Sequence, residues 1–307
     1  MEAITEKIKA LKEEKNAIIL GHYYQRPEIQ EISDFVGDSL ELSRRAMTTD
    51  ADIIVFAGVF FMAETAKILN PSKKVLVPDL DAGCSLEMSC PPEQLKAFKD
   101  ENPDHIVLTY INASAGVKAL SDYICTSSNA EKILASIPED KPLLFAPDKN
   151  LGAYLMAKTG RKMDLWDGVC IVHEAFSLEK LVNLKMEHKG AKLVAHPESG
   201  SDVLKIADFI GSTSKMIDYI ENSEDDKFIV GTEAGILHEL KKRVPHKELI
   251  PVPIDEDNTC SCSECAFMKL NTLEKIADAL ENEAPEVHLD PLLIEEAKAP
   301  LERMMAM

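Results

Sequence analysis

Three stretches of equal length decide the fold: GHYYQRPEIQEISDFVGDS (21–39), TYINASAGVKALSDYICTS (109–127) and AHPESGSDVLKIADFIGST (195–213). Each places an aspartate twelve residues after a histidine or tyrosine, and a hydroxyl residue five residues after the aspartate. The matching triplets are His22, Asp34 and Ser39; Tyr110, Asp122 and Ser127; and His196, Asp208 and Thr213. A repeat with a period of about 87 residues predicts three structural units, whose polar residues would meet around a pseudo-threefold axis.

Short apolar runs alternate with helical spacing in every unit. We expect strands at 16–20, 52–56 and 74–77, then at 105–110, 141–145 and 164–166, and finally at 192–195, 227–230 and 248–252. In the first unit, residues 28–46 and 60–69 have helical spacing. This alternation predicts parallel βαβ layers. Polar residues then fall after strand ends and before helix N-termini, where such layers bind ligands.

The predicted fold class is therefore α/β, with three pseudo-symmetric αβα domains whose parallel, Rossmann-like sheets surround a central site. A length of 307 residues alone would suggest about two domains, but the repeat favours three smaller ones. The expected boundaries are 1–100, 101–189 and 190–266 for the three repeats, and 267–307 for a C-terminal helix and closing segment.

The charge balance restricts the partners. The chain carries 34 basic and 53 acidic residues, a net charge of −19, which argues against nucleic acid and means that local donors must attract any anionic substrate. Residues 1–15 have no signal-peptide core, and the longest apolar run, 53–63, is well short of the ~20 residues of a membrane helix. We expect a soluble cytoplasmic protein without a membrane partner and, lacking Gly-x-Gly-x-x-Gly, without a nucleotide cofactor.

The cysteines indicate metal or redox chemistry, because there are seven of them and no secretion signal. Cys84, Cys170 and Cys265 stand at the matching end of each unit. Three thiolates without a fourth would suit an iron–sulfur cluster with one open iron, which could bind substrate as a Lewis acid. Glycines beside the first two cysteines, Gly83 and Gly168, would let the backbone approach such a cofactor closely.

Other interpretations of the cysteines remain open. Zinc is the chief alternative, because Cys260-x-Cys262-x-x-Cys265 is rich in thiols, and unmetallated thiols are the third. Cys90 and Cys125 are more typical of packing than of chemistry. A disulfide between Cys260 and Cys262 would be strained, so their role stays open.

Nine polar residues occupy equivalent positions in the three units: His22, Tyr24, Ser39, Tyr110, Asn112, Ser127, His196, Glu198 and Thr213. A single hydroxyl residue before a helix is more typical of a cap. Three that converge would form an anion cradle for carboxylates or phosphate. The histidines, tyrosines and glutamate add groups that can transfer protons. His173, three residues after Cys170, is expected to face the same site.

At these positions the chain resembles the quinolinate synthase family over nearly its whole length. Ten motifs carry the resemblance. Some of them overlap the three opening stretches, and the others include VLVPDLDAGCSL (75–86), WDGVCIVHEAF (166–176), VGTEAGI (230–236) and CAFMKLNTLEK (265–275). It implies three αβα domains around one 4Fe-4S cluster. The implied reaction is a transferase reaction of de novo NAD biosynthesis, in which iminoaspartate and dihydroxyacetone phosphate condense to quinolinate, phosphate and water.

The resemblance also implies roles for individual residues. It makes Cys84, Cys170 and Cys265 the cluster ligands, with one iron left open, and Tyr24, Glu198 and His173 the catalytic groups. Substrate would be bound by His22, Ser39, Tyr110, Asn112, Ser127, His196, Glu198, Ser212 and Thr213. The enzyme that supplies iminoaspartate is a possible protein partner. Family members often space the last cysteines C-x-x-C-x-x-C, whereas this chain has C-x-C-x-x-C, which puts disulfide regulation in doubt.

Three rival functions use some of the same features. A hydro-lyase of the aconitase type would need the open iron but no phosphate site. An iron–sulfur redox sensor or electron carrier prefers four cysteines, and in it the helix mouths flanked by Asp34, Asp122 and Asp208 would have no purpose. A zinc-stabilised binding module is the third.

Overall fold

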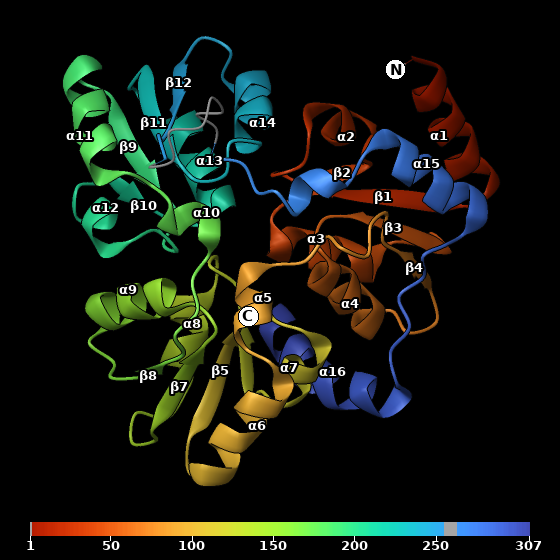
Figure 1. Ribbon diagram of the computed structural model, residues 1–307, viewed down its shortest axis with the longest axis horizontal. Coiled ribbons are helices and arrows are strands. Elements are labelled where there is room, and N and C mark those ends of the chain that lie inside the picture. Colours follow the sequence, from red (N-terminus) through yellow and green to blue (C-terminus); the bar gives the residue numbers. More distant parts are fainter. Residues whose placement is uncertain (1, 255–262) are drawn as a thin grey trace.

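The computed structural model describes residues 2–254 and 263–307, and it contains three parallel, four-stranded sheets that form the three lobes of Figure 1. All three sheets have the same strand order, so the chain is built from three equivalent units. The first unit has β1 (Ala17–His22), β2 (Phe35–Gly37), β3 (Ile53–Ala57) and β4 (Lys74–Leu76) in the order β2-β1-β3-β4. The second has β5 (Ile106–Tyr110), β6 (Tyr123–Cys125), β7 (Leu143–Ala146) and β8 (Asp164–Leu165), and the third has β9 (Lys192–Ala195), β10 (Phe209–Ile210), β11 (Lys227–Gly231) and β12 (Glu248–Pro251).

Helices cover the sheets and connect their strands. The helices that precede or connect the strands of the first sheet are α1 (Glu2–Glu14), α2 (Pro27–Ile32), α3 (Ser39–Thr48) and α4 (Phe60–Leu69), followed by α5 (Ser85–Ser89) and α6 (Pro92–Glu101). The second sheet contributes α7 (Ala115–Ala119), α8 (Ala130–Ala135) and α9 (Lys149–Thr159), followed by α10 (Ile171–Glu174) and α11 (Leu178–Glu187). The third contributes α12 (Ser201–Lys205), α13 (Thr213–Asn222) and α14 (Ile236–Arg243), and α15 (Leu273–Asn282) and α16 (Pro291–Met305) close the sequence.

The predicted α/β fold class is confirmed, and the nine predicted strands appear within two residues of their expected ends. The predicted helix over 28–46 is wrong, because α2 ends at Ile32 and β2 intervenes before α3. Asp38 starts α3 with a capping box: its carboxylate accepts from the amides of Leu40 and Glu41, and Glu41 accepts from the amide of Asp38. Equivalent short strands, β6 and β10, were missed in the other units.

The repeated aspartates have a structural role that differs from the prediction. Their carboxylates accept hydrogen bonds from first-strand amides at 2.7, 2.8 and 2.8 Å, in the pairs Asp34–Ile19, Asp122–Val107 and Asp208–Leu193. Each aspartate immediately precedes β2, β6 or β10, at the amino end of that strand. They therefore fasten the two strands together, and they do not flank the helix mouths at the carboxyl ends.

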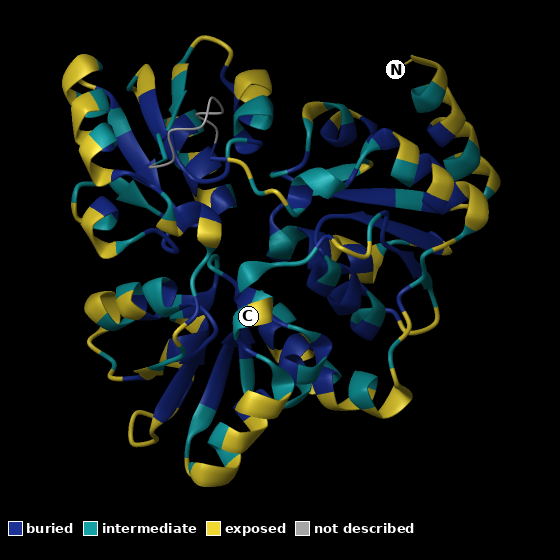
Figure 2. Cartoon of the chain, in the orientation of Figure 1, coloured by how far each residue is buried: buried dark blue, intermediate teal, exposed yellow. Residues whose placement is uncertain are grey.

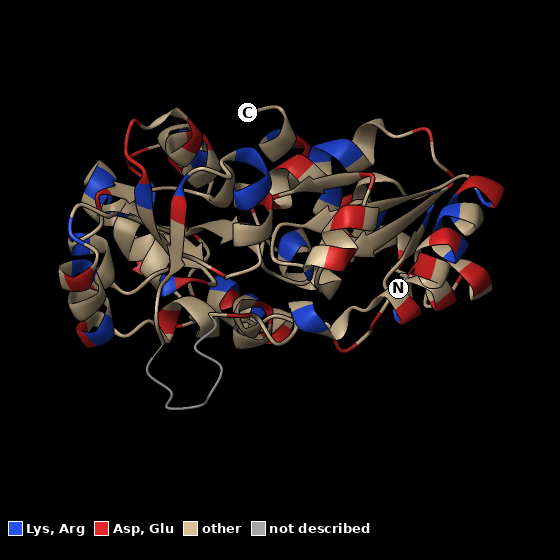
Figure 3. Ribbon diagram, turned by 90° about the horizontal axis from the view of Figure 1, so that it is seen from above, with Lys and Arg blue, Asp and Glu red and all other residues tan. Residues whose placement is uncertain are grey.

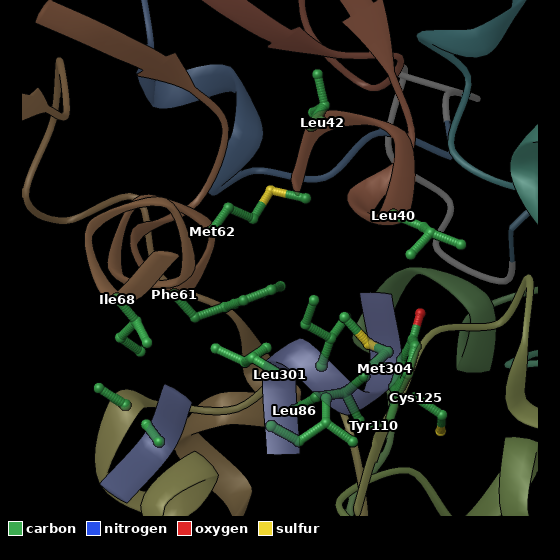
Figure 4. Close-up of a cluster of buried hydrophobic side chains, with 14 of the residues drawn as sticks. Leu40, Leu42, Phe61, Met62, Ile68, Leu86, Tyr110, Cys125, Leu301 and Met304 are labelled. Atoms are coloured by element: carbon green, nitrogen blue, oxygen red, sulfur yellow. The ribbon is translucent and has the colours of Figure 1, made fainter. Parts of the chain in front are cut away.

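The first two units share one large apolar core, which includes Leu40, Phe61, Tyr110 and Phe145. Helix α16 packs against α4, α7 and β6 and adds Leu301 and Met304 to this core (Figure 4). The third unit has two separate clusters, one on each face of its sheet. In Figure 2 the strands are buried and the exposed residues gather on the outer helices.

Some connecting helices pack across the expected domain boundaries. Leu95 of α6 lies in a cluster with Val107 of the second sheet, and Leu181 of α11 lies in a cluster with Leu193 of the third. The segment after residue 267 contains α15, which packs on α1 and β3, and the helical α16 where an extended segment was expected. The boundaries themselves stay a prediction.

Charged residues lie mostly on the outer helices and loops (Figure 3). Among the described residues, no helix combines the length and the apolar composition needed to cross a bilayer.

Asp122→Ala should lower the free energy of unfolding by about 1–3 kcal/mol, because the part-buried amide of Val107 loses its carboxylate partner. Urea denaturation followed by circular dichroism measures the change. Asp100→Ala is the control, since Asp100 forms an exposed ion pair with Lys96 and its loss should change stability by no more than about 0.5 kcal/mol. Equal losses in the two variants would contradict the structural role of Asp122.

Candidate active site

One cavity lies where the carboxyl ends of strands from all three sheets converge. It contains thirteen of the fourteen predicted site residues, which come from every unit: His22, Tyr24, Ser39, Cys84, Tyr110, Asn112, Ser127, Cys170, His173, His196, Glu198, Thr213 and Cys265. Val59, Phe61, Met62 and Phe267 add an apolar side to the wall. The pseudo-threefold arrangement predicted from the repeat therefore produces a single composite site.

Ser212 is the predicted site residue that the structure does not place in the wall. Its hydroxyl accepts from the amide of Lys215 at 3.4 Å and caps α13. The neighbouring hydroxyl of Thr213 instead bonds the phenol oxygen of Tyr24 at 2.9 Å. Ser127 likewise contacts Nε2 of His196 at 3.2 Å. In the first and third units the capping side chain, Asp38 or Ser212, thus precedes the hydroxyl of the cavity, so Ser39 and Thr213 are not the caps of their helices.

Glu198 is the centre of the polar network. Its side chain is buried, with Oε1 accepting from the hydroxyl of Tyr110 and Oε2 lying 2.9 Å from Nδ1 of His173 and 3.8 Å from Nδ1 of His196. Burial by itself would raise the pKa of Glu198, but the hydrogen bonds from His173 and from the Tyr110 hydroxyl help to hold that pKa below its ordinary value. Glu198 is therefore a carboxylate at neutral pH.

A chain of hydrogen bonds connects Glu198 to Tyr24. Nε2 of His173 lies 2.9 Å from the hydroxyl of Thr232, which lies 2.6 Å from the phenol oxygen of Tyr24. Burial, followed by the charge of Glu198, raises the pKa of Tyr24, so the phenol keeps its proton. The two residues expected as a proton-transfer pair are linked through two intermediaries, of which Thr232 was not predicted.

His22 and His196 are held in the same way. The amide of Tyr24 donates to Nδ1 of His22 at 3.1 Å, and the amide of Glu198 donates to Nδ1 of His196 at 3.4 Å. Burial lowers the pKa of both imidazoles to about 4, so they are neutral at pH 7. Since Nδ1 accepts, the proton is assigned to Nε2, which makes each histidine a donor at its other ring nitrogen.

The three cavity cysteines are free thiols from three different units. Cys84 and Cys170 immediately precede α5 and α10, and burial raises the pKa of all three thiols. Sγ of Cys170 lies 3.1 Å from Nδ1 of His173, and together with Glu198 these residues form a group that could hold a metal ion. Cys90 and Cys125 lie in apolar clusters, as predicted, and Cys260 and Cys262 fall outside the described residues.

The two glycines beside cysteines differ in how closely other protein segments approach them. A Cβ on Gly168 would lie 2.2 Å from Oγ of Ser89 and 2.4 Å from the carbonyl oxygen of Pro147, whereas one on Gly83 would meet no protein atom closer than 3.8 Å. Gly168 is therefore needed for close packing between protein segments, and the expected approach of Gly83, which lines the cavity, to a cofactor stays a prediction.

A second group that the sequence prediction missed holds the segment around Cys265. Oε1 of Glu233 accepts from the amide of Cys265 at 3.0 Å and lies 2.8 Å from Nζ of Lys269. Lys269 also donates to the carbonyl oxygen of Tyr24 at 2.7 Å. Glu233 follows the end of β11, as does Thr232, so their place after a strand was the available signal; nothing in the sequence marked Lys269.

The amide of Asn112 is the clearest mark of a ligand. Its buried Oδ1 has no hydrogen-bond partner among the described residues, although buried polar atoms are normally paired. Because Asn112 lines the cavity, a bound molecule would complete its bonding.

Comparison with known proteins identifies relatives over the whole length. The family model described as "Quinolinate synthetase A protein" matches residues 6–306. Proteins named quinolinate synthase from Nostoc punctiforme, Chloroherpeton thalassium and Synechocystis sp. are 56%, 55% and 54% identical over 300 residues. Each alignment covers 98% of this chain, and it covers 92%, 93% and 94% of the respective relative.

The thermal midpoint Tm should fall between pH 7 and pH 5, and the Tm of the His22→Asn variant should fall less than that of the unchanged protein. Because burial lowers the pKa of His22 to about 4 while an unfolded histidine titrates near 6.5, the unfolded state binds more protons in this window and stability decreases as pH falls. The exposed His246→Asn is the control and should follow the unchanged protein. A His22→Asn curve parallel to the unchanged one would count against this assignment.

Proposed function

The chain belongs to the quinolinate synthetase A protein family, and we propose that it condenses iminoaspartate with dihydroxyacetone phosphate to quinolinate, phosphate and two waters. The step would belong to de novo NAD biosynthesis in the cytoplasm. The observation that carries this proposal is the convergence of three thiols, neutral donors and the Glu198 network in one cavity. Atoms and electrons balance without an oxidant, so the site must supply binding, proton transfer and dehydration only.

The proposed cofactor is one 4Fe-4S cluster held by Cys84, Cys170 and Cys265. The donor set fits: three unpaired thiols reach one cavity, no other cysteine lines it in the described part of the chain, and the raised thiol pKa values mean that metal binding has to drive their deprotonation. When bound, a cluster with three protein ligands supplies an open iron that can polarise a substrate oxygen as a Lewis acid.

Substrate anions would be bound by neutral donors. His22 and His196 present Nε2, Ser39, Ser127 and Thr213 present hydroxyls, and Asn112 presents an amide. Fixed donors of this kind, in a buried site, attract carboxylates and phosphate even in a chain of net charge −19.

Proton transfer would start at Glu198, which is ionised and can accept a proton from substrate. Tyr24, whose pKa is raised, can donate one to a departing hydroxyl group. His173 and Thr232 can each accept on one side and donate on the other, so the hydrogen-bonded chain can return the proton from Glu198 to Tyr24. Abstraction and dehydration would thus be coupled inside the cavity.

The purified protein should form quinolinate from iminoaspartate and dihydroxyacetone phosphate, and Glu198→Gln should lower kcat by about 10²-fold or more because the base is lost. Product and phosphate are followed by chromatography and a phosphate assay, and the iron–sulfur absorption should be unchanged. The matched control is Glu174→Gln, an exposed carboxylate bonded to Asn150, which should retain activity.

Failure of the unchanged protein to form quinolinate would refute the proposed reaction. Loss of the cluster in Glu198→Gln would instead show that this residue supports the metal centre and is not the base.

Anaerobic purification should yield about four irons and four sulfides per chain, because three cysteine ligands can hold a 4Fe-4S cluster and leave its fourth iron open. Cys84→Ala, Cys170→Ala and Cys265→Ala should each lose them, whereas Cys90→Ala and Cys125→Ala should keep them, since the latter two thiols lie in apolar clusters. Metal and sulfide analysis measures this. Zinc in place of iron would favour an ion at Cys170, His173 and Glu198 and would contradict the cluster.

A further inference from the structure

Lys118 is a fully buried cation behind the cavity wall, and it takes no part in the proposed chemistry. It lies on α7 with 0% of its side chain exposed. Its ammonium donates to the carbonyl oxygen of Ala113 and, at 3.5 Å, to that of Phe61, and it lies 5.1 Å from the centroid of the Phe61 ring. Lysine is almost never fully buried unless it is paired.

One carbonyl group belongs to Phe61, which lines the cavity, and the other to Ala113, the residue next to Asn112 of the wall. Ala113 directly follows Asn112, whose buried Oδ1 has no hydrogen-bond partner among the described residues. Phe61 lines the part of the same wall that the first unit contributes. Phe61 lies on α4 of the first unit and Ala113 follows β5 of the second. Lys118 therefore connects two wall segments that come from different units.

A second contact from α4 holds the same loop. Oε2 of the buried Glu64, on α4, accepts from the amide of Ala115 at 2.9 Å. The segment that carries Asn112 is thus bound by an ammonium at Ala113 and by a carboxylate at Ala115, both close to the first unit. This places the loop more firmly than the short α7 could by itself.

Nearby carboxylates explain how a buried lysine is tolerated there. The cost of burying its charge argues against a role in packing alone. Lys118 faces Glu64 of α4 and Glu87 of α5; burial, opposed by these two carboxylates, lowers its pKa to about 8. Taking such a group out of water is costly, and an apolar side chain of similar size is often neutral or stabilising at such a position. Retention of the cation is therefore better explained by what it positions.

We propose that Lys118 is a positioning residue that sets Asn112 against Phe61 across the boundary of the first two units, so that the amide of Asn112 meets the substrate. The inference rests on the proposed function. The inference goes beyond that function because it concerns a residue that touches neither substrate nor cofactor.

The test is a double-mutant cycle between Lys118→Met and Asn112→Ala in the iron-loaded enzyme. Both kcat/KM and the dissociation constant of quinolinate are measured. Lys118→Met should lower kcat/KM and weaken quinolinate binding about tenfold, which is the effect typical of losing a charged hydrogen-bond donor. With Ala already at position 112, the same change should cost less than about twofold, because residues that act through one another are not additive.

Lys99→Met is the matched control, since Lys99 also donates to a carbonyl oxygen beside α7, that of Leu120 at 2.6 Å, but away from the cavity. It should leave both readouts within about twofold of the unchanged enzyme. If Lys118→Met does not fold, Glu64→Ala removes the second contact to the loop and enters the same cycle with Asn112→Ala, with the same expected non-additivity.

The outcomes separate the two proposals. An unchanged enzyme that neither binds nor forms quinolinate overturns the proposed function. The positioning role is overturned, and the function stands, if the enzyme is active but the effects of the two changes at 118 and 112 are additive. The same holds if Lys118→Met changes kcat/KM and quinolinate binding no more than Lys99→Met does.

Discussion

Phe61, Tyr110 and Leu301 pack in one apolar core although they come from three separate stretches of the chain. This core, shared by the first two units and α16, fixes how those units face each other, and the wall of the cavity is built on its surface. The third unit has its own apolar clusters, in which Tyr23 is the buried residue contributed by the first unit. Polar contacts across the cavity, among them Tyr24 to Thr213 and Tyr110 to Glu198, also hold it in place.

The electrostatics of the cavity follow from burial and not from the charge of the whole chain. No lysine or arginine is among the side chains that line it in the described residues, and His22 and His196 are neutral. Glu198 keeps its charge although it is buried, because it accepts hydrogen bonds from His173 and Tyr110. The site therefore combines neutral donors for anions with the carboxylate of Glu198, which can accept a proton, an arrangement suited to proposed substrates that arrive as anions and lose water.

Much of this could be predicted from the sequence, because the repeat ties each residue to two equivalents. The matching places of Cys84, Cys170 and Cys265 indicated one site before any fold was known, and the strand ends located most of its wall. The strands β2, β6 and β10 were missed because two or three residues carry no periodicity, and the aspartates before them were therefore expected to flank the helix mouths. Ser212 could not be distinguished from Thr213, since which of two adjacent hydroxyls turns inward depends on the helix that follows.

The contacts between units could not be predicted from the sequence. Thr232 gains its importance from bonding both His173 and Tyr24, and Lys269 from joining Glu233 to the first unit. Gly168 appeared to make room for a cofactor, whereas it makes room for Pro147 and Ser89. Each depends on tertiary neighbours far away in sequence, where local spacing holds no information.

The place of α16 has a consequence for the order of events during synthesis. Domains generally fold in turn as the chain emerges from the ribosome. Here, however, Leu301 and Met304 follow the third sheet in the sequence and yet complete the core between the first two units. Those two units must wait, with part of their apolar surface uncovered, until the whole of the third has been translated. The nascent protein thus has a long interval in which a chaperone would find a binding surface that the finished molecule no longer offers.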